Sequence, residues 1–224
     1  MNFETKRAAL EKIYALHDEF AAGLDAACRK GCAICCTANV TVTTLEGFLM
    51  RPQIEACGQT DRLATADNRG FRPTITTNHM AALCKDGKEL PEESMDPAPG
   101  PCPLLTDQIC PVYAVRPFGC RSMVSSRNCA ETGMADMDEW VITVNHLFMQ
   151  FIEHLDGNGC SGNLADVLAV LSDPEKRAEF EAAKLICRTT GLIPNRPIPV
   201  LMIPPEYQDQ AMPLVEKLRA CVSG

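Results

Sequence analysis

The stretch CRKGCAICC, residues 28–36, carries four cysteines within nine positions. Gly31 can supply a tight turn and helical periodicity ends here, so we predict a loop. Cys32 and Cys35 have the spacing at which two sulfurs chelate one metal around a turn. Neighbouring side chains diverge in extended backbone, which leaves three roles open for the pair Cys35 and Cys36. One of the two can ligate a second metal, bridge two metals, or meet cysteines further along the chain.

Four more cysteines are spread over residues 102–129 and complete a set of eight. A tetrahedral zinc ion or an iron–sulfur cluster needs about four thiolates that converge on one point. Eight cysteines therefore suffice for two four-coordinate sites, or for one cluster and a structural metal. Adjacent and closely spaced cysteines in loops have no packing reason to be cysteine, which argues against a purely hydrophobic role. The eight are Cys28, Cys32, Cys35, Cys36, Cys102, Cys110, Cys120 and Cys129.

The other five of the thirteen cysteines stand singly in or beside apolar helical stretches. A lone cysteine in such a place is most often a small buried hydrophobic residue. The chain begins with a charged amphipathic segment, unlike a secretory signal peptide, so we expect a cytoplasmic protein. Disulfides are rare in that reducing compartment, and an odd total would leave one thiol unpaired. The five expected core cysteines are Cys57, Cys84, Cys160, Cys187 and Cys221.

The composition is that of an ordinary globular chain. Its 224 residues are 46% hydrophobic and 22% charged, close to globular averages. No apolar run approaches the roughly 18 residues that a membrane helix needs. A formal charge of -8 at pH 7 disfavours attraction to phosphate backbones or anionic lipid. We therefore expect neither a nucleic acid nor a membrane as a partner.

Hydrophobic periodicity predicts several amphipathic helices. Thr43 and Glu46 are spaced as a capping box ahead of one helix. Asp173 is a suitable N-cap for another, with Pro174 at its first helical position. The expected helices cover residues 3–24, 45–57, 137–155, 164–171, 174–188 and 213–221.

Proline-rich segments interrupt these helices. Six prolines within residues 86–111 predict an extended loop, and residues 193–205 are also expected to be extended. Residues 104–112 can form a short hairpin. The expected fold class is mainly α, with an irregular, metal-stabilised cysteine-rich core and one short β-hairpin. We expect a single domain, 1–224, with a cysteine-cluster metal-binding core at 28–130 and a helical C-terminal extension at 137–224.

Three of the cysteines also match the motif of a different class of protein. Cys28, Cys32 and Cys35 have the C-x3-C-x2-C spacing by which radical S-adenosylmethionine enzymes hold three irons of a [4Fe–4S] cluster. That fold alternates strands and helices, with the triad after the first strand, whereas a long helix is expected before it here. The position before the third cysteine, usually aromatic in those enzymes, is Ile34. Cys36 and the later cysteines are also unexplained, so a radical enzyme is our third hypothesis.

A more specific resemblance rests on two strings of motifs. Upstream stands C-x3-C-x2-CC at 28–36; downstream stand CPLL at 102–105, CPVY at 110–113 and VRPFGCR at 115–121. Together they resemble the YkgJ or CxxCxxCC family of cysteine-cluster proteins, which is described as a zinc- or iron-chelating domain. The resemblance covers about residues 28–130. It implies a metal-binding protein whose ligands are Cys28, Cys32, Cys35, Cys36, Cys102, Cys110, Cys120 and Cys129.

The downstream motifs also contain two candidate cofactor-binding residues, Arg116 and Arg121. A cluster bound by four thiolates carries negative charge, which guanidinium groups beside Cys120 would offset while raising a reduction potential. In the alternative, these arginines bond loop carbonyls, and both roles stay open. Tyr113 is expected to be a packing residue. The four histidines have no ligand-like spacing, and we expect them at the surface or behind the ligands: His17, His79, His146 and His154.

Two functions of different classes follow from these features. The first is a cytoplasmic metal-cluster protein, iron–sulfur of the [4Fe–4S] type in preference to zinc, which acts in electron transfer or in modification or maturation of another protein. Its partner would be a protein substrate or a redox protein. The second is a non-enzymatic zinc-stabilised scaffold or interaction module, in which bound metal contributes folding free energy. No motif nominates a general base or nucleophile, so catalytic activity stays open, as does the oligomeric state.

Overall fold

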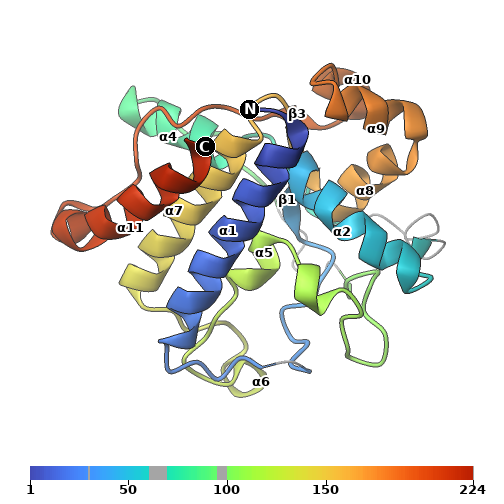
Figure 1. Ribbon diagram of the computed structural model, residues 1–224. Helices are drawn as coiled ribbons and strands as arrows, with labels where there is room; N and C mark the ends of the chain where they lie inside the picture. Colours follow the sequence, from blue (N-terminus) through green and yellow to red (C-terminus); the bar gives the residue numbers. More distant parts are fainter. Residues whose placement is uncertain (30, 61–69, 95–99, 224) are drawn as a thin grey trace.

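A computed structural model describes residues 1–29, 31–60, 70–94 and 100–223 of the chain. The described residues are mainly helical and include one small antiparallel sheet, which confirms the helical part of the expected fold class (Figure 1). The elements are α1 (Phe3–Ala22), β1 (Thr41–Thr43), α2 (Thr44–Ala56), α4 (Thr77–Lys85), η1 (Tyr113–Val115), α5 (Phe118–Arg121), α6 (Cys129–Thr132), α7 (Glu139–Leu155), β2 (Cys160–Asn163), α8 (Leu164–Ser172), α9 (Pro174–Glu181), α10 (Cys187–Thr190), β3 (Ile193–Pro194), η2 (Pro205–Tyr207) and α11 (Gln208–Val222).

Three long helices, α1, α7 and α11, pack against one another and form one side of the core (Figure 1). Asn2 caps α1 and Asp138 caps α7, each with a side-chain oxygen that accepts a hydrogen bond from the first turn. The apolar stripe of α7 is buried, with Val144, Leu147 and Phe148 fully shielded from solvent. The expected helices at 3–24 and 137–155 are therefore confirmed. No helix in the described part of the chain is long and apolar enough to cross a membrane.

The capping box at the start of α2 is also confirmed. The backbone N–H of Glu46 donates to Thr43 Oγ1 at 3.2 Å, and Glu46 Oε2 accepts from the Thr43 N–H at 2.8 Å. The helix packs closely on α8 at Gly47, where an added Cβ would lie 2.7 Å from a methyl group of Val167. Glycine is therefore required there by the approach of the two helices.

The sheet lies outside the segment in which we expected a hairpin. Its order is β1-β2-β3, with both pairs antiparallel, and Val42 is paired with Gly162. Within 104–112 the structure has a single bridge, between Thr106 and Ile109. The predicted hairpin is therefore present only as its turn. Thr106 and Ile109 exchange two backbone hydrogen bonds, at 3.0 and 2.8 Å, across Asp107 and Gln108, which both have positive φ, and within 104–112 no ladder extends beyond that pair.

Two helix boundaries differ from those expected. The helix predicted over 174–188 ends at Glu181, because Ala183 adopts a positive φ of 56° and the chain turns before α10. The last helix begins at Gln208 rather than at 213. The described parts of the predicted loop 86–111 contain neither helix nor strand, while residues 95–99 of that loop lie outside the described residues.

Candidate metal centre

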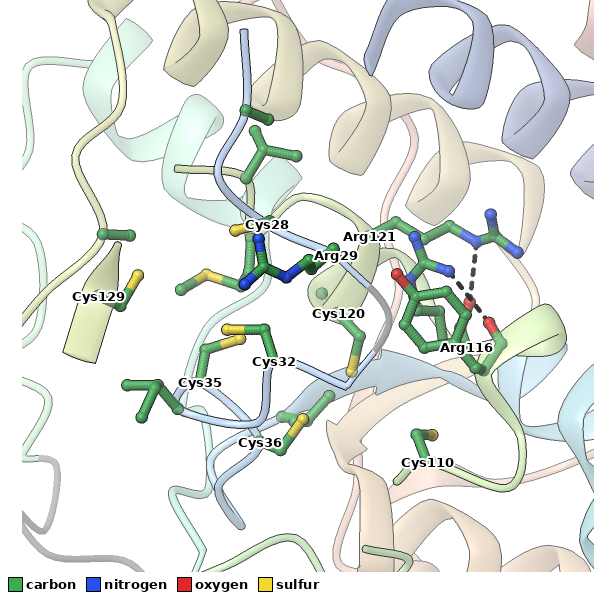
Figure 2. Close-up of a pocket in the computed structure, with 18 of the residues that line it drawn as sticks. Cys28, Arg29, Cys32, Cys35, Cys36, Cys110, Arg116, Cys120, Arg121 and Cys129 are labelled. Atoms are coloured by element: carbon green, nitrogen blue, oxygen red, sulfur yellow. Dashed lines mark hydrogen bonds between the residues drawn. The ribbon is translucent and has the colours of Figure 1, made fainter. Parts of the chain in front are cut away.

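All eight cysteines of the two motif strings line one cavity of about 650 Å³. Figure 2 labels all of them except Cys102. They come from four parts of the chain: the loop after α1, the segment around 102–110, α5 and α6. Each of the eight is a free thiol. The two groups of cysteines, separated by more than sixty residues of intervening chain, thus lie around the same cavity, while their role as metal ligands stays a prediction. The thiols are Cys28, Cys32, Cys35, Cys36, Cys102, Cys110, Cys120 and Cys129.

Backbone hydrogen bonds join the segments that carry these thiols. The N–H of Cys102 donates to the carbonyl of Cys36 at 2.8 Å, and Thr37 forms a bridge with Pro101. On the other side, the N–H of Ala27 donates to the carbonyl of Ser125 at 2.7 Å. The irregular cysteine loops are thus fixed to each other by main-chain contacts, although they lack long elements of secondary structure.

The two Cys-Pro motifs form turns that direct N–H groups at sulfur. Proline fixes φ at the second position of a turn and has no N–H, so the first free donor is two residues after the cysteine. The N–H of Leu104 donates to the Cys102 sulfur, and that of Val112 donates to the Cys110 sulfur. Such N–H···S bonds stabilise thiolates and tune the potentials of iron–sulfur centres. The CPLL and CPVY motifs are thereby explained as sulfur-binding turns.

Burial keeps most of the cavity thiols protonated at neutral pH when no metal is bound. It raises the pKa of Cys102 and Cys110, and it raises that of Cys120 to about 12. Cys36 differs, because the Cys35 thiol donates a hydrogen bond to its sulfur and lowers its pKa. Metal binding at these thiols must therefore release protons, and it should weaken as the pH falls.

We expect Cys36 to react with iodoacetamide before Cys120 in metal-free protein at pH 7.5. The thiolate is the reactive form, and it is favoured at Cys36 and disfavoured at Cys120. The ratio of the two rates should be at least about tenfold. Peptide mapping by mass spectrometry after short labelling times measures it, with urea-denatured protein as the control in which the two rates converge. Faster labelling of Cys120 would contradict the assignment.

Both predicted cofactor-binding arginines line the cavity, and both bond loop carbonyls. Arg121 has a side chain only 5% exposed; it donates to the carbonyls of Arg116 and Ala114 and pairs with Asp18 at 2.7 Å. Arg116 donates to the Tyr113 carbonyl at 3.1 Å and lies 4.0 Å over the centre of the Tyr113 ring. For Arg121, these contacts favour the alternative role, in which the guanidinium group bonds loop carbonyls. Its role beside a cofactor, like that of Arg116, stays a prediction.

His17 was expected at the surface or behind the ligands, and the structure buries it in the wall of the cavity. It is 1% exposed and packs edge-on against Phe118 and Phe148. Its Nε2 lies 3.2 Å from Asn145 Oδ1, while Nδ1 has no hydrogen-bond partner. Burial lowers the pKa of His17, so the ring is neutral at pH 7. Sequence spacing could not identify this residue, because α1 and the cysteine loops meet only in the folded chain.

The eight thiols are suitable metal ligands by their chemistry, but their positions in the structure are less suitable. Among the described residues, no group of three or more histidine, cysteine or acidic side chains is gathered tightly enough to hold an ion. The donor set, the shared cavity and the N–H···S bonds are nevertheless those of a thiolate site. Metal binding at this site requires the thiols to move inward. The expected metal-stabilised core therefore stays a prediction.

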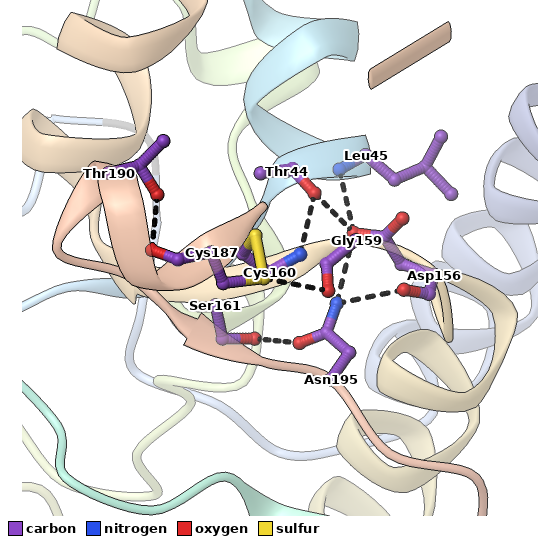
Figure 3. Close-up of a disulfide and its surroundings, with 9 residues drawn as sticks. All are labelled: Thr44, Leu45, Asp156, Gly159, Cys160, Ser161, Cys187, Thr190 and Asn195. Atoms are coloured by element: carbon purple, nitrogen blue, oxygen red, sulfur yellow. Dashed lines mark hydrogen bonds between the residues drawn. A yellow bond between two sulfur atoms is a disulfide. The ribbon is translucent and has the colours of Figure 1, made fainter. Parts of the chain in front are cut away.

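The five cysteines outside the cavity differ from the expectation of free core residues. Cys160 and Cys187 are buried as expected, but they form a disulfide that ties β2 to α10, with their Cα atoms 5.7 Å apart (Figure 3). The expectation that the chain contains no disulfide was wrong for this pair. Because disulfides are typical of oxidising compartments, the cytoplasmic location stays a prediction. Of the others, Cys84 is exposed, while Cys57 and Cys221 are partly buried.

A fully buried carboxyl lies beside the disulfide (Figure 3). Asp156 Oδ2 accepts hydrogen bonds from Thr44 Oγ1 at 2.7 Å, from the Leu45 N–H at 3.1 Å and from Asn195 Nδ2 at 3.0 Å. Its Oδ1 has no partner. Burial raises the pKa of Asp156 to about 7, even though three donors surround Oδ2. This network fixes the start of α2 to the end of α7.

The comparisons with known proteins add no relative for this site. Neither a family model, nor a curated protein, nor a solved structure matches the chain.

Proposed function

We propose that the chain is a metal-cluster protein that binds an iron–sulfur cluster through cavity cysteines, and that it acts in electron transfer or in modification or maturation of another protein. One observation carries this proposal: eight free thiols from four parts of the chain line a single cavity. Thiolates are the ligands that iron–sulfur clusters take, in sets of four. The likeness of the motifs to the YkgJ type points the same way.

The residues around the thiols are suited to hold negative charge. Backbone N–H groups reach the sulfurs of Cys28, Cys102 and Cys110. Burial raises the pKa of Cys110, and the Arg116 charge acts in the opposite direction. A bound cluster would supply one-electron transfer, and these donors would set its reduction potential. The exposed side chains of Ile34 and Met134 at the wall of the cavity give a protein partner an apolar surface to approach.

Metal and sulfide analysis of anaerobically purified protein tests this function. We expect about four irons and four sulfides per chain, and absorbance near 400 nm that dithionite bleaches. A Cys120→Ser variant should lose much of this content, whereas Cys84→Ser should keep it, because Cys84 is exposed and lies outside the cavity. Colourless protein with stoichiometric zinc and no sulfide would refute the iron–sulfur proposal.

One observation favours the second candidate, a zinc-stabilised scaffold. The cysteines lie on segments with little regular structure, and three of them, Cys102, Cys110 and Cys120, pack against the hydrophobic core. Metal at such a place would contribute directly to the free energy of folding. Loss of the near-ultraviolet circular dichroism on chelation, without redox activity, would favour this role. The radical enzyme has less support, since the described strands form a small antiparallel sheet and α1 precedes the triad.

A further inference from the structure

The folded chain groups the eight cavity cysteines differently from their order in the sequence. By order, one group is the cluster at 28–36 and the other is the set at 102–129. In the structure two members exchange places: Cys36 lies with the later cysteines, and Cys129 lies with the earlier ones. Figure 2 shows Cys129 on the side of the cavity nearer Cys28, and Cys110 on the opposite side.

The position of Cys36 follows from the backbone. A turn closed by the Cys36 N–H and the Ala33 carbonyl, at 3.0 Å, places Cys35 within the turn and Cys36 at its exit. From there the chain runs beside Pro101, and the Cys36 carbonyl accepts the N–H of Cys102. The thiol of Cys36 also interacts electrostatically with those of Cys120, Cys102 and Cys110. These three pack against the hydrophobic core.

The position of Cys129 follows from a second contact. The N–H of Ala27 donates to the Ser125 carbonyl, and the Ser125 N–H donates to the Cys28 sulfur. This pairing brings the start of α6, which carries Cys129, beside the loop that follows α1. The Cys28 thiol interacts electrostatically with those of Cys129, Cys32 and Cys35. Cys35 also interacts with Cys120, so the adjacent pair at 35 and 36 lies where the two groups meet.

We infer that the thiols, once they move inward, form two four-thiolate metal centres: an inner centre of Cys36, Cys102, Cys110 and Cys120 against the core, and an outer centre of Cys28, Cys32, Cys35 and Cys129. The inference rests on the proposed metal-binding function of the same cavity and adds to it the number of centres and their ligands. The adjacent cysteines, whose thiols are hydrogen-bonded to each other, supply one ligand to each centre at the boundary between the two.

Cobalt titration of metal-free protein counts the centres independently of iron and sulfide. Tetrahedral cobalt bound by thiolates absorbs in the visible and gives a sulfur-to-cobalt charge-transfer band. We expect two Co²⁺ per full-length chain, with Cys84→Ser as the matched control that keeps both. Saturation at one equivalent would overturn the inference.

Four double variants test whether the ligands of each centre are grouped by their positions in space or by their order in the sequence. If the groups are spatial, Cys36→Ser/Cys102→Ser and Cys28→Ser/Cys129→Ser each damage one centre and keep one cobalt with a full thiolate spectrum. The crossed variants Cys28→Ser/Cys36→Ser and Cys102→Ser/Cys129→Ser damage both centres and keep none. Grouping by sequence order predicts the reverse pattern, which would overturn the assignment.

Wild-type protein gives a second test that needs no folded variant. After one equivalent of Co²⁺, iodoacetamide labelling and peptide mapping identify the four protected thiols. Protection of either spatial group supports the inference, and protection of the four cysteines at 28–36 together overturns it. The two proposals fail separately. Protein that binds two cobalt ions but contains no native iron or sulfide refutes only the proposed iron–sulfur function. Protein that contains an iron–sulfur cluster but has only one metal centre refutes only the inference of two centres.

Discussion

Replacing Glu46 with alanine should lower the free energy of unfolding by about 4 kcal/mol. The side chain is 3% exposed, and its Oε1 accepts hydrogen bonds from Tyr14 Oη at 2.8 Å and from the Phe118 N–H at 2.7 Å. Oε2 accepts from the Thr43 N–H. Truncation leaves these three buried donors without a partner, and each unsatisfied group costs about 1–3 kcal/mol. The effect also reaches the site, because Phe118 begins the short helix that carries Cys120.

Urea denaturation followed by circular dichroism measures this loss. Glu46→Gln keeps one acceptor oxygen and should lose only about 1–2 kcal/mol. Glu55→Ala is the matched control on the same helix: Glu55 is exposed and pairs only at the surface with Arg51, so its loss should stay within about 0.5 kcal/mol. A Glu46→Ala variant as stable as Glu55→Ala would show that these hydrogen bonds contribute little.

Asp156→Asn should remove a large part of the dependence of stability on pH. Burial raises the pKa of Asp156 from its ordinary value of 3.8 to about 7 in the folded chain. Between these values the folded state keeps a proton that the unfolded state has released, so the free energy of unfolding falls as the pH rises. Below about pH 4 both states hold the proton, and above about pH 7 the loss is complete. At 1.36 kcal/mol per pKa unit, the loss across this window is about 4 kcal/mol.

The difference in stability between wild type and Asp156→Asn isolates this group, because other titrating residues contribute equally to both proteins. We expect that difference to change by about 4 kcal/mol between pH 4 and pH 8, in favour of the variant at the higher pH. Lys6 acts against the shift, and Glu46 adds to it. Parallel stability curves for wild type and Asp156→Asn would show that Asp156 is ionised without penalty in the fold.

The parts of the fold that the sequence predicted have local causes. The helices α1, α2 and α7 carry caps and apolar stripes within their own residues, so periodicity and the capping box at Thr43 sufficed. The sheet was missed because β2, with the sequence CSGN, lacks strand alternation and is ordered by its neighbours. The break near Ala183 was missed because nothing in that alanine indicates a positive φ.

In the candidate site, too, the features with local causes could be predicted and those that depend on distant contacts could not. Which cysteines belong to the candidate set could be predicted from their motifs, because short spacings and turn residues are local properties. How they group could not, since the exchange of Cys36 and Cys129 depends on contacts with Cys102 and Ser125 that only the folded chain makes. The disulfide was missed for a related reason. Cys160 and Cys187 are 27 residues apart and carry no mutual motif, and β2, β3 and α10 bring them together.

That disulfide makes residues 160–187 a covalent ring, which contains α8 and α9. The chain leaves α9 through an exposed stretch that includes Lys184, a natural point for cleavage by trypsin. A cut there opens the ring without releasing either part of the chain, so the nicked protein migrates as one species until it is reduced. After such a cut, no continuous peptide backbone would join the core to the C-terminal helix α11. The disulfide would still keep this helix, which packs on α1 and α7, covalently attached to the core.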